Sequence, residues 1–139
     1  MTDLELMRHA EAARAYAYAP YSHFCVGAAL LGESGKIYTG CNIENAAYAP
    51  TNCAERTAFF KAISEGERRF VAIAVIGGRE GESGSFCAPC GVCRQVMAEF
   101  CDVDFPIILG DVNDCTRHSL RSLLPASFGK QDIAGGADT

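Results

Sequence analysis

Residues 70–109 read FVAIAVIGGREGESGSFCAPCGVCRQVMAEFCDVDFPIIL and contain two apolar runs separated by a helical pattern. The first run, residues 70–76, is continuous, which is typical of a strand that is buried on both faces. Residues 77–85 are Gly-rich and charged and are expected to form a surface loop. A helix that starts near Cys90 follows, and residues 105–109 predict a second buried strand. A strand, a helix and a strand in this order predict two parallel strands joined by a right-handed crossover.

The segments before this unit predict further elements of the same sheet. Residues 25–31 are nearly all apolar and residues 36–41 return after the turn 32–35, so they predict an antiparallel hairpin. Residues 54–63 carry apolar side chains on one helical face, and Gly66 is placed to end that helix. Together these elements predict a mixed sheet with helices on both faces. The residues expected to be buried are Ala54, Ala58, Phe59, Ala62 and Ile63 in the earlier helix and Val92, Val96, Met97 and Phe100 in the later one.

The two ends of the chain carry weaker signals. Residues 2–5 have the Thr-x-x-Glu spacing of a capping box, which predicts an amphipathic helix that stops before Pro20. Residues 118–124 fit either a last strand or a short helix, and Pro125 ends that element. Residues from about 130 to 139 are expected to form a mobile tail. The apolar stripe of the first helix is expected at Leu4, Met7, Ala10, Ala13 and Ala17.

The composition is that of a globular protein and not of a nucleic-acid-binding one. Of the 139 residues, 49% are hydrophobic and 21% are charged, so we expect a single domain over residues 1–139. The formal net charge of −5 argues against a polynucleotide partner, because nucleic-acid binding depends on basic patches. Residues 1–14 mix Asp, Glu and Arg with apolar residues and fit neither a signal peptide nor a membrane span. We therefore expect a small neutral substrate and no membrane partner.

The chain has eight cysteines, which is a high count. A secreted disulfide scaffold is one explanation, but no signal peptide is expected and the chain is long enough for a core without cross-links. Metal ligands and free thiols therefore fit better, which implies a reducing compartment, the cytoplasm. Four cysteines in or beside apolar stretches are expected to be small core residues, namely Cys25, Cys41, Cys101 and Cys115.

Three of the other cysteines form a split cluster that predicts a zinc site. Cys53 stands alone, whereas Cys90 and Cys93 form a Cys-x-x-Cys pair directly after Pro89. Zinc in catalytic sites commonly has three protein ligands and leaves the fourth position to water. Glu55 follows Cys53 by two residues, where a carboxylate can move protons of that water without binding the metal. We therefore predict a hydrolytic zinc site with Glu55 as its catalytic residue.

Two other arrangements of these residues stay open. Cys87 and Cys90 are themselves a Cys-x-x-Cys pair, and a fourth ligand at Cys87 would make the site closed and structural. Glu55 also has a structural interpretation, because with Asn52 as N-cap it would complete a capping box. Three thiolates on a divalent cation leave one excess negative charge. Arg56 is therefore predicted to donate hydrogen bonds to ligand sulfurs, unless it is an ordinary solvent-facing helix residue.

Residues 53–55 and 89–93, together with Asn42-Ile43-Glu44-Asn45, resemble the zinc-dependent nucleoside and nucleobase deaminases. Members of that superfamily can carry His-x-Glu in the first motif, and Cys53 stands where the His would be. This three-Cys form is similar to the small homotetrameric cytidine deaminases. The resemblance covers residues 19–128, most of the chain, and implies the cytidine deaminase fold, a three-layer α/β/α sandwich with one Zn2+ per subunit.

The resemblance also implies the reaction and the residues that bind the substrate. The reaction is hydrolytic deamination of cytidine and deoxycytidine to uridine and deoxyuridine plus ammonia, a step of pyrimidine salvage. Asn42 and Glu44 match the pair that binds ribose hydroxyls, although alone they would be turn residues. Phe24 matches the ring that packs on the pyrimidine, although alone it would be a core residue. The backbone N–H of Ala54 is placed to bind the O2 carbonyl of the base. In this family neighbouring subunits complete the pocket, and the matching positions here are Ala46, Tyr48 and Phe128.

Two rival functions remain at this point. One is a different zinc deaminase that acts on a free base, a nucleotide, a drug or a polynucleotide, although Asn42 with Glu44 favours a nucleoside. The other is a non-enzymatic zinc module with a closed four-ligand site that binds partner proteins.

Overall fold

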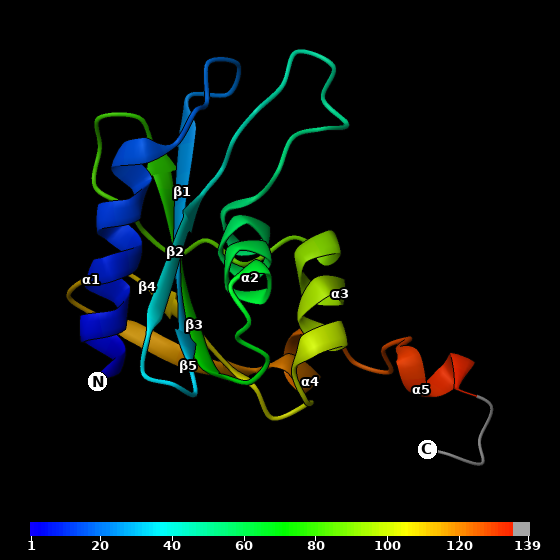
Figure 1. Ribbon diagram of the computed structural model, residues 1–139. Helices are drawn as coiled ribbons and strands as arrows, with labels where there is room; N and C mark the ends of the chain where they lie inside the picture. The colour runs from blue at the N-terminus through cyan, green and yellow to red at the C-terminus, as the bar shows by residue number, and fades with distance from the viewer. Residues whose placement is uncertain (135–139) are drawn as a thin grey trace.

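The computed structural model describes residues 1–134 of the chain. Its elements are α1 (Asp3–Ala13), the 3-10 turn η1 (Arg14–Tyr16), β1 (Phe24–Gly32), β2 (Ile37–Cys41), α2 (Ala54–Ser64), β3 (Phe70–Arg79), α3 (Gly91–Phe100), β4 (Pro106–Gly110), β5 (Cys115–Ser119), α4 (Leu120–Leu123) and α5 (Lys130–Ile133). The strands form one mixed sheet in the order β2-β1-β3-β4-β5. α1 covers one face of the sheet, and α2 and α3 cover the other (Figure 1). This three-layer α/β arrangement confirms the fold class that the sequence predicts.

The strand pairing places the start of α3 at the end of β3. β1 pairs with β2 and with β3 in antiparallel directions, which confirms the predicted hairpin. β3 and β4 are parallel and α3 connects them, which confirms the predicted crossover. A crossover helix begins at the carboxyl edge of the sheet, where open α/β folds place their functional sites.

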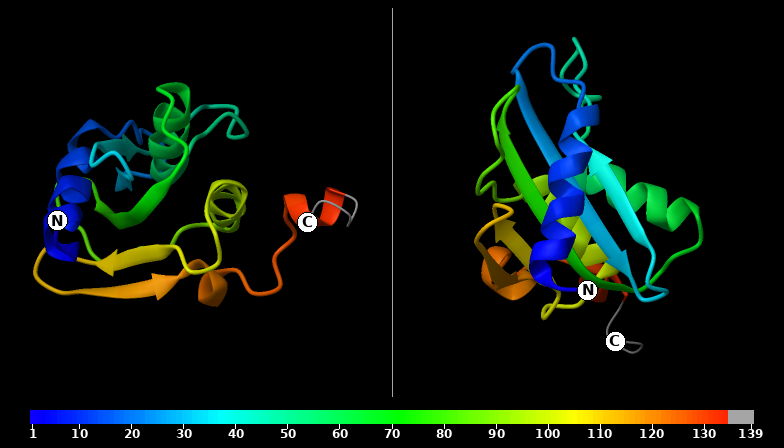
Figure 2. Two further views of the ribbon diagram at one scale, coloured as in Figure 1. Left: turned by 60° about the horizontal axis from the view of Figure 1, so that its bottom comes forward. Right: turned by 90° about the vertical axis from the view of Figure 1, so that its left-hand side faces the viewer.

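The two faces of the sheet carry two separate hydrophobic cores. Alternate residues along a strand point to opposite faces of the sheet. Leu30 and Val75 lie on the face covered by α2 and α3, where they belong to the same core cluster as Phe59 of α2. Smaller residues of the same strands, among them Ala29 and Ala74, face α1. Figure 2 shows α1 crossing the sheet on that face. A Cβ atom at Gly27 of β1 would lie 2.0 Å from Ala10 O, so α1 packs close to the sheet at this point.

Most of the predicted helix faces are buried, with one clear exception. Ala54, Ala58, Phe59 and Ala62 are fully buried in α2, as predicted, and so is Met97 in α3. The prediction for Val92 is wrong, because its side chain is 58% exposed. The buried residues of α3 are Cys93 and Met97, and Val92 lies outside the face that they define.

The first helix ends earlier than the sequence predicts. Its capping interaction is present, since Thr2 Oγ1 accepts from Glu5 N–H at 3.1 Å. The helix stops at Ala13, however, and Ala17 is already extended. Tyr18 pairs with the distant loop after β2, donating to Asn42 O at 3.0 Å and accepting from Glu44 N at 2.8 Å. This tertiary pairing draws the chain out of the helix before Pro20. The buried residues of α1 are Leu6, Met7, Ala10 and Ala13.

The second half of the chain extends two of the predicted elements. β3 continues through Gly77 to Arg79, which the sequence places in a loop, because β1 supplies partners up to the end of that strand. Residues 118–124 contain both alternatives, the end of β5 and the helix α4. Within the predicted mobile tail, α5 is a short helix, and residues 135–139 lie outside the described part of the chain. Gly66 ends the α2 region with a φ of 98°, as expected for a C-terminal glycine.

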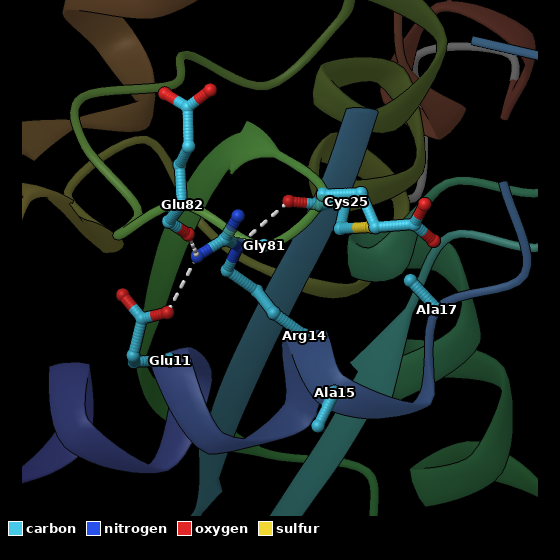
Figure 3. A pocket seen from close by; sticks show the side chains of 8 residues that line it. Glu11, Arg14, Ala15, Ala17, Cys25, Gly81 and Glu82 are labelled. Atoms are coloured by element: carbon cyan, nitrogen blue, oxygen red, sulfur yellow. Dashed lines mark hydrogen bonds and ion pairs between the residues drawn. The ribbon is translucent and has the colours of Figure 1, made fainter. Parts of the chain in front are cut away.

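Arg14 fastens the segment after β3 to the first helix (Figure 3). This side chain is 7% exposed and donates to Cys25 O at 2.7 Å and to Glu82 O at 3.1 Å. It also pairs with Glu11 at 2.6 Å, and the second oxygen of Glu11 accepts from Gly84 N–H. The start of β1 and the segment that leads toward α3 are therefore tied to the same guanidinium group.

No helix among residues 1–134 has both the length and the apolar character needed to cross a bilayer.

Candidate active site

The three cysteines of the predicted metal site meet where α2 and α3 begin. Cys53 is the N-cap of α2, Cys90 is the N-cap of α3, and Cys93 lies in the first turn of α3. Their sulfur atoms all lie within 4.8 Å of one another, and those of Cys53 and Cys90 are 3.7 Å apart. Both helices rest on the same face of the sheet, which brings together residues that are 37 positions apart in the sequence.

The donor set fits a zinc ion. Two sulfurs on a tetrahedral zinc with Zn–S bonds of ~2.3 Å are separated by roughly 3.8 Å. The 3.7 Å between Cys53 Sγ and Cys90 Sγ agrees with this value. Neither N-cap side chain bonds to the backbone of its own helix, so the sulfurs remain available as ligands. The positive ends of two helix dipoles also favour thiolates at this point.

The ionisation of the cysteine thiols favours binding of a cation. A hydrogen bond from Cys93, together with one from Arg56, lowers the pKa of Cys53 to about 5 in spite of burial. The hydrogen bond to Cys53 is the main cause that raises the pKa of the neighbouring Cys93 thiol, and burial raises it further. A second thiolate beside the first therefore requires a compensating positive charge, which a divalent cation supplies.

Arg56 lies against the cluster on the first turn of α2. Its Nη2 donates to Cys53 Sγ at 3.2 Å. Its Nε is buried and has no hydrogen-bond partner among the described residues. The effect of this guanidinium group on a bound metal stays a prediction.

Glu55 is buried beside the sulfurs. Its side chain is only 3% exposed, and burial raises the pKa of the carboxyl to about 7. The structure does not support the capping-box interpretation, because α2 starts after Cys53 and has no side-chain cap. Asn52, the cap in that interpretation, instead donates to Thr57 Oγ1 at 3.1 Å. A buried carboxyl that exchanges a proton near neutral pH is suited to general acid–base chemistry.

Cys87 lies outside the sulfur cluster. Among the described residues, the group of close metal-ligating atoms contains Cys53, Cys90 and Cys93 only. Burial, together with the negative charge of Glu55, raises the pKa of the Cys87 thiol to about 11. The closed four-ligand site therefore has no geometric support, and all eight cysteines are free.

Asn42 and Phe24, both predicted to contact the substrate, are joined by one hydrogen bond. Asn42 Oδ1 accepts from Val26 N–H at 2.9 Å, and Asn42 Nδ2 donates to Phe24 O at 2.8 Å. The amide thus fixes the first residues of β1 on both sides of Cys25. The Phe24 side chain remains 38% exposed and is not a core residue.

Glu44 organises the loop that precedes Phe24. Its carboxylate accepts from the backbone N–H groups of Tyr21 and Ser22 and from Ser22 Oγ. The hydrogen bond from Ser22 Oγ is the main cause that lowers the pKa of Glu44, so the group stays anionic. Ser22 Oγ in turn accepts from Phe24 N–H at 3.0 Å. Ser22 has no predicted role, although the resemblance begins at the segment that contains it.

The other predicted substrate residues are not gathered at one place in the chain. Ala54 is fully buried at the start of α2. Ala46 and Tyr48 lie on the exposed loop between β2 and α2, where Tyr48 is 73% exposed. Phe128 is 60% exposed and its carbonyl oxygen accepts from Gln95 Nε2 of α3 at 2.8 Å. The segment between α4 and α5, to which it belongs, lies on the far side of α3 from α2 (Figures 1 and 2). Within one chain this loop and Phe128 are therefore separate.

Comparison with known proteins gives one consistent result. Residues 1–109 match the family model of the cytidine and deoxycytidylate deaminase zinc-binding region. A cytidine deaminase of Sporosarcina psychrophila is 51% identical over 138 residues, covering 96% of each chain. The crystal structure of cytidine deaminase from Burkholderia pseudomallei superposes with a TM-score of 0.84 at 48% identity, covering 92% of this chain and 100% of that one. The enzyme from Mycobacterium tuberculosis gives a TM-score of 0.77 at 39% identity, with coverage of 90% and 95%.

Proposed function

The chain belongs to the cytidine and deoxycytidylate deaminase zinc-binding family, and from this premise we propose that it hydrolyses cytidine and deoxycytidine to uridine and deoxyuridine with release of ammonia. One observation carries the proposal. Three cysteine sulfurs converge within 4.8 Å beside Glu55, a carboxyl that is almost completely buried. A metal site next to a buried carboxyl group suits a hydrolysis in which protons of one water molecule are transferred to two nitrogen atoms of the substrate.

Cys53, Cys90 and Cys93 hold one Zn2+ per subunit in this proposal. The chemistry that a zinc ion supplies in such a site is Lewis acidity, which makes water a nucleophile near neutral pH. Arg56 offsets the excess negative charge of the three thiolates through its contact with Cys53.

Glu55 carries the protons. Its carboxylate accepts a proton from the attacking water and donates it to ring N3, which makes C4 of the cytosine more electrophilic. Once the water oxygen has added to C4, the carboxylate takes the remaining proton of the new C4 hydroxyl group and delivers it to the exocyclic amine. The C4–N bond then breaks, ammonia leaves and the C4 carbonyl of uridine forms. One carboxyl group within reach of all three positions suffices, and its pKa of about 7 allows both protonation states.

The nucleoside is held by residues at the start of β1 and in the loop after β2. The backbone N–H of Ala54, at the N-terminus of α2, binds O2 of the base, and the half-exposed ring of Phe24 packs on the pyrimidine. Asn42 already makes two hydrogen bonds, so one lone pair of Oδ1 and one N–H of Nδ2 remain for a sugar hydroxyl. Glu44, fixed by Tyr21 and Ser22, accepts from a second hydroxyl.

The active form is a homotetramer whose pockets are shared between subunits. Tyr48 and Phe128 are large, exposed and separate within one chain, which supports a role in the pocket of a neighbouring subunit. Eight free cysteines support a reducing compartment, so the proposed location is the cytoplasm and the proposed pathway is pyrimidine salvage.

Turnover tests the proposed function. The zinc-loaded protein is incubated with cytidine, deoxycytidine, cytosine and CMP, and the loss of the cytosine absorbance is followed with and without a chelator. We expect cytidine and deoxycytidine to be converted, cytosine and CMP to react much more slowly, and a chelator that removes the zinc to stop the reaction. Absence of turnover by zinc-loaded, folded protein would contradict the proposal.

A further inference from the structure

Gly77 lies in β3 near the candidate active site. Because it is a glycine, neighbouring side chains can approach its backbone closely. Along β3, Ile73 and Val75 point toward α2 and α3, and by the same alternation the Cα–H of Gly77 points to that face. A Cβ atom at Gly77 would lie 2.9 Å from Phe24 Cε2, 2.9 Å from Cys87 Sγ and 3.0 Å from Cys87 Cβ. These separations are shorter than van der Waals contacts. The absence of a side chain at Gly77 therefore leaves room for both Phe24 and Cys87 beside this strand.

The backbone of Gly77 is held on both sides. Gly77 pairs with Val26 of β1 on one side. On the other side, Gly77 N donates to Ser85 O at 3.1 Å, and Ser85 N donates to Gly77 O at 2.8 Å. Because neighbouring chain segments hold both edges, a side chain at this position would displace Phe24 or Cys87 and not the strand.

The two side chains in contact with Gly77 belong to the surroundings of the candidate site. Phe24 is the first residue of β1, and its backbone is held by Ser22 and Asn42. Cys87 lies three residues before the predicted ligand Cys90 and is close enough to Glu55 for that charge to affect its thiol. Gly77 thus connects the predicted base-stacking ring with the segment that leads into the metal cluster.

We propose that Gly77 is a positioning residue of the deaminase, which seats the Phe24 ring and Cys87 side by side as one wall of the nucleoside pocket. This inference rests on the proposed function, because it assumes that Phe24 packs on the pyrimidine. The three atoms nearest to a Cβ at Gly77 belong to Phe24 and Cys87 and not to the three predicted ligands or Glu55, so Gly77 acts on how the base is held and not on proton transfer. A larger residue at position 77 narrows the pocket and turns the Phe24 ring away from the base.

The test compares two neighbouring glycines. In Gly77→Ala the new methyl group points at Phe24 and Cys87. In Gly78→Ala it points to the opposite face, 2.9 Å from Arg14 Nη2 and 2.9 Å from Ser83 O. We expect Gly77→Ala to raise KM for cytidine about tenfold, the size expected for overpacking, with kcat and zinc content within about twofold of the parent. Gly78→Ala is the matched control, with a lower thermal midpoint and an unchanged KM.

Two further variants keep the test decisive if Gly77→Ala folds poorly. Gly77→Ala combined with Cys87→Ala removes the sulfur from the crowded site, so part of the rise in KM is expected to be reversed. Cys87→Leu fills the same space from the other side with Gly77 intact, and it too is expected to raise KM more than it lowers kcat. Cys87→Ala alone serves as the reference for the double variant.

Specific results would overturn the inference. They are a parental KM in both Gly77→Ala and Cys87→Leu, an equal rise in KM for Gly78→Ala, or a double variant no better than Gly77→Ala. These outcomes leave the proposed function intact, because the parent protein still deaminates cytidine. An inactive parent protein with full zinc content would instead overturn the proposed function, and this inference with it.

Discussion

At the scale of single residues, Glu55 is the side chain predicted to transfer protons without binding the metal. It lies next to the sulfur cluster and is 3% exposed, and a capping box does not explain its burial because the N-cap of α2 is Cys53 and has no side-chain cap. Burying a carboxyl group costs free energy, and burial raises its pKa to about 7. A buried carboxyl group with a raised pKa beside a cluster of metal-ligating residues is typical of a catalytic residue.

Glu55→Gln is expected to keep the fold and the zinc but to lower kcat by about 100-fold to 10,000-fold, the usual contribution of general acid–base catalysis. The amide has the same shape as the carboxyl group but does not carry protons. The measurements are kcat, zinc content and thermal midpoint. Glu65→Gln, at the exposed end of α2, is the control and should retain full activity. An active Glu55→Gln protein would contradict the assignment.

Arg56 is the second residue whose role can be isolated. Arg56→Gln removes the positive charge beside Cys53 while keeping much of the side-chain length. We expect the affinity for zinc to fall by roughly 10-fold to 100-fold, as for other residues that support metal ligands. Competition with a chromogenic chelator measures this affinity, with the exposed Arg69→Gln as control. Equal zinc affinity in the two variants would show that Arg56 has no such role.

At the scale of elements, Arg14, the C-cap of α1, ties that helix to the loop after β3. Arg14 bonds to carbonyl groups of β1 and of that loop and pairs with Glu11 (Figure 3). In Arg14→Met these carbonyl groups lose their donor and Glu11 loses its partner. The free energy of unfolding is expected to fall by about 3 kcal/mol, the range found when one partner of a buried pair is removed. Denaturant titration of the metal-loaded protein measures the change. Arg8→Met, on the exposed side of the same helix, should change it by less than about 0.5 kcal/mol.

At the scale of the whole molecule, the shared pocket can be tested by mixing subunits. Glu55→Gln chains lack the proposed catalytic acid, and Phe128→Ala chains lack the ring proposed to enter a neighbouring pocket. If the pocket is shared, mixed tetramers contain sites with Glu55 from one chain and Phe128 from another, and activity should exceed that of either variant alone. Glu55→Gln mixed with Cys53→Ala is the control, because these two residues act in the same chain and no activity should return. A parent protein that sediments as an active monomer would exclude the shared pocket.

The sequence alone predicted the order of the elements from α1 to β4 and a cluster of three cysteines as metal ligands. The hairpin, the parallel crossover and the buried face of α2 follow from the spacing of apolar residues, which is a local property of the chain. The cluster of Cys53, Cys90 and Cys93 follows from ligand spacing, because both groups fall at helix starts that the same patterns predict.

Features that depend on partners far away in the chain became visible only in the folded structure. The first helix ends at Ala13 because Tyr18 pairs with the loop after β2, and β3 runs on to Arg79 because β1 lies beside it. Val92 is exposed because α3 packs through another face. A side chain at position 77 would be crowded because Phe24 and Cys87, from two different segments, both lie close to Gly77. Periodicity along the chain carries no information about such meetings, since they are set by which segments the folded chain brings together.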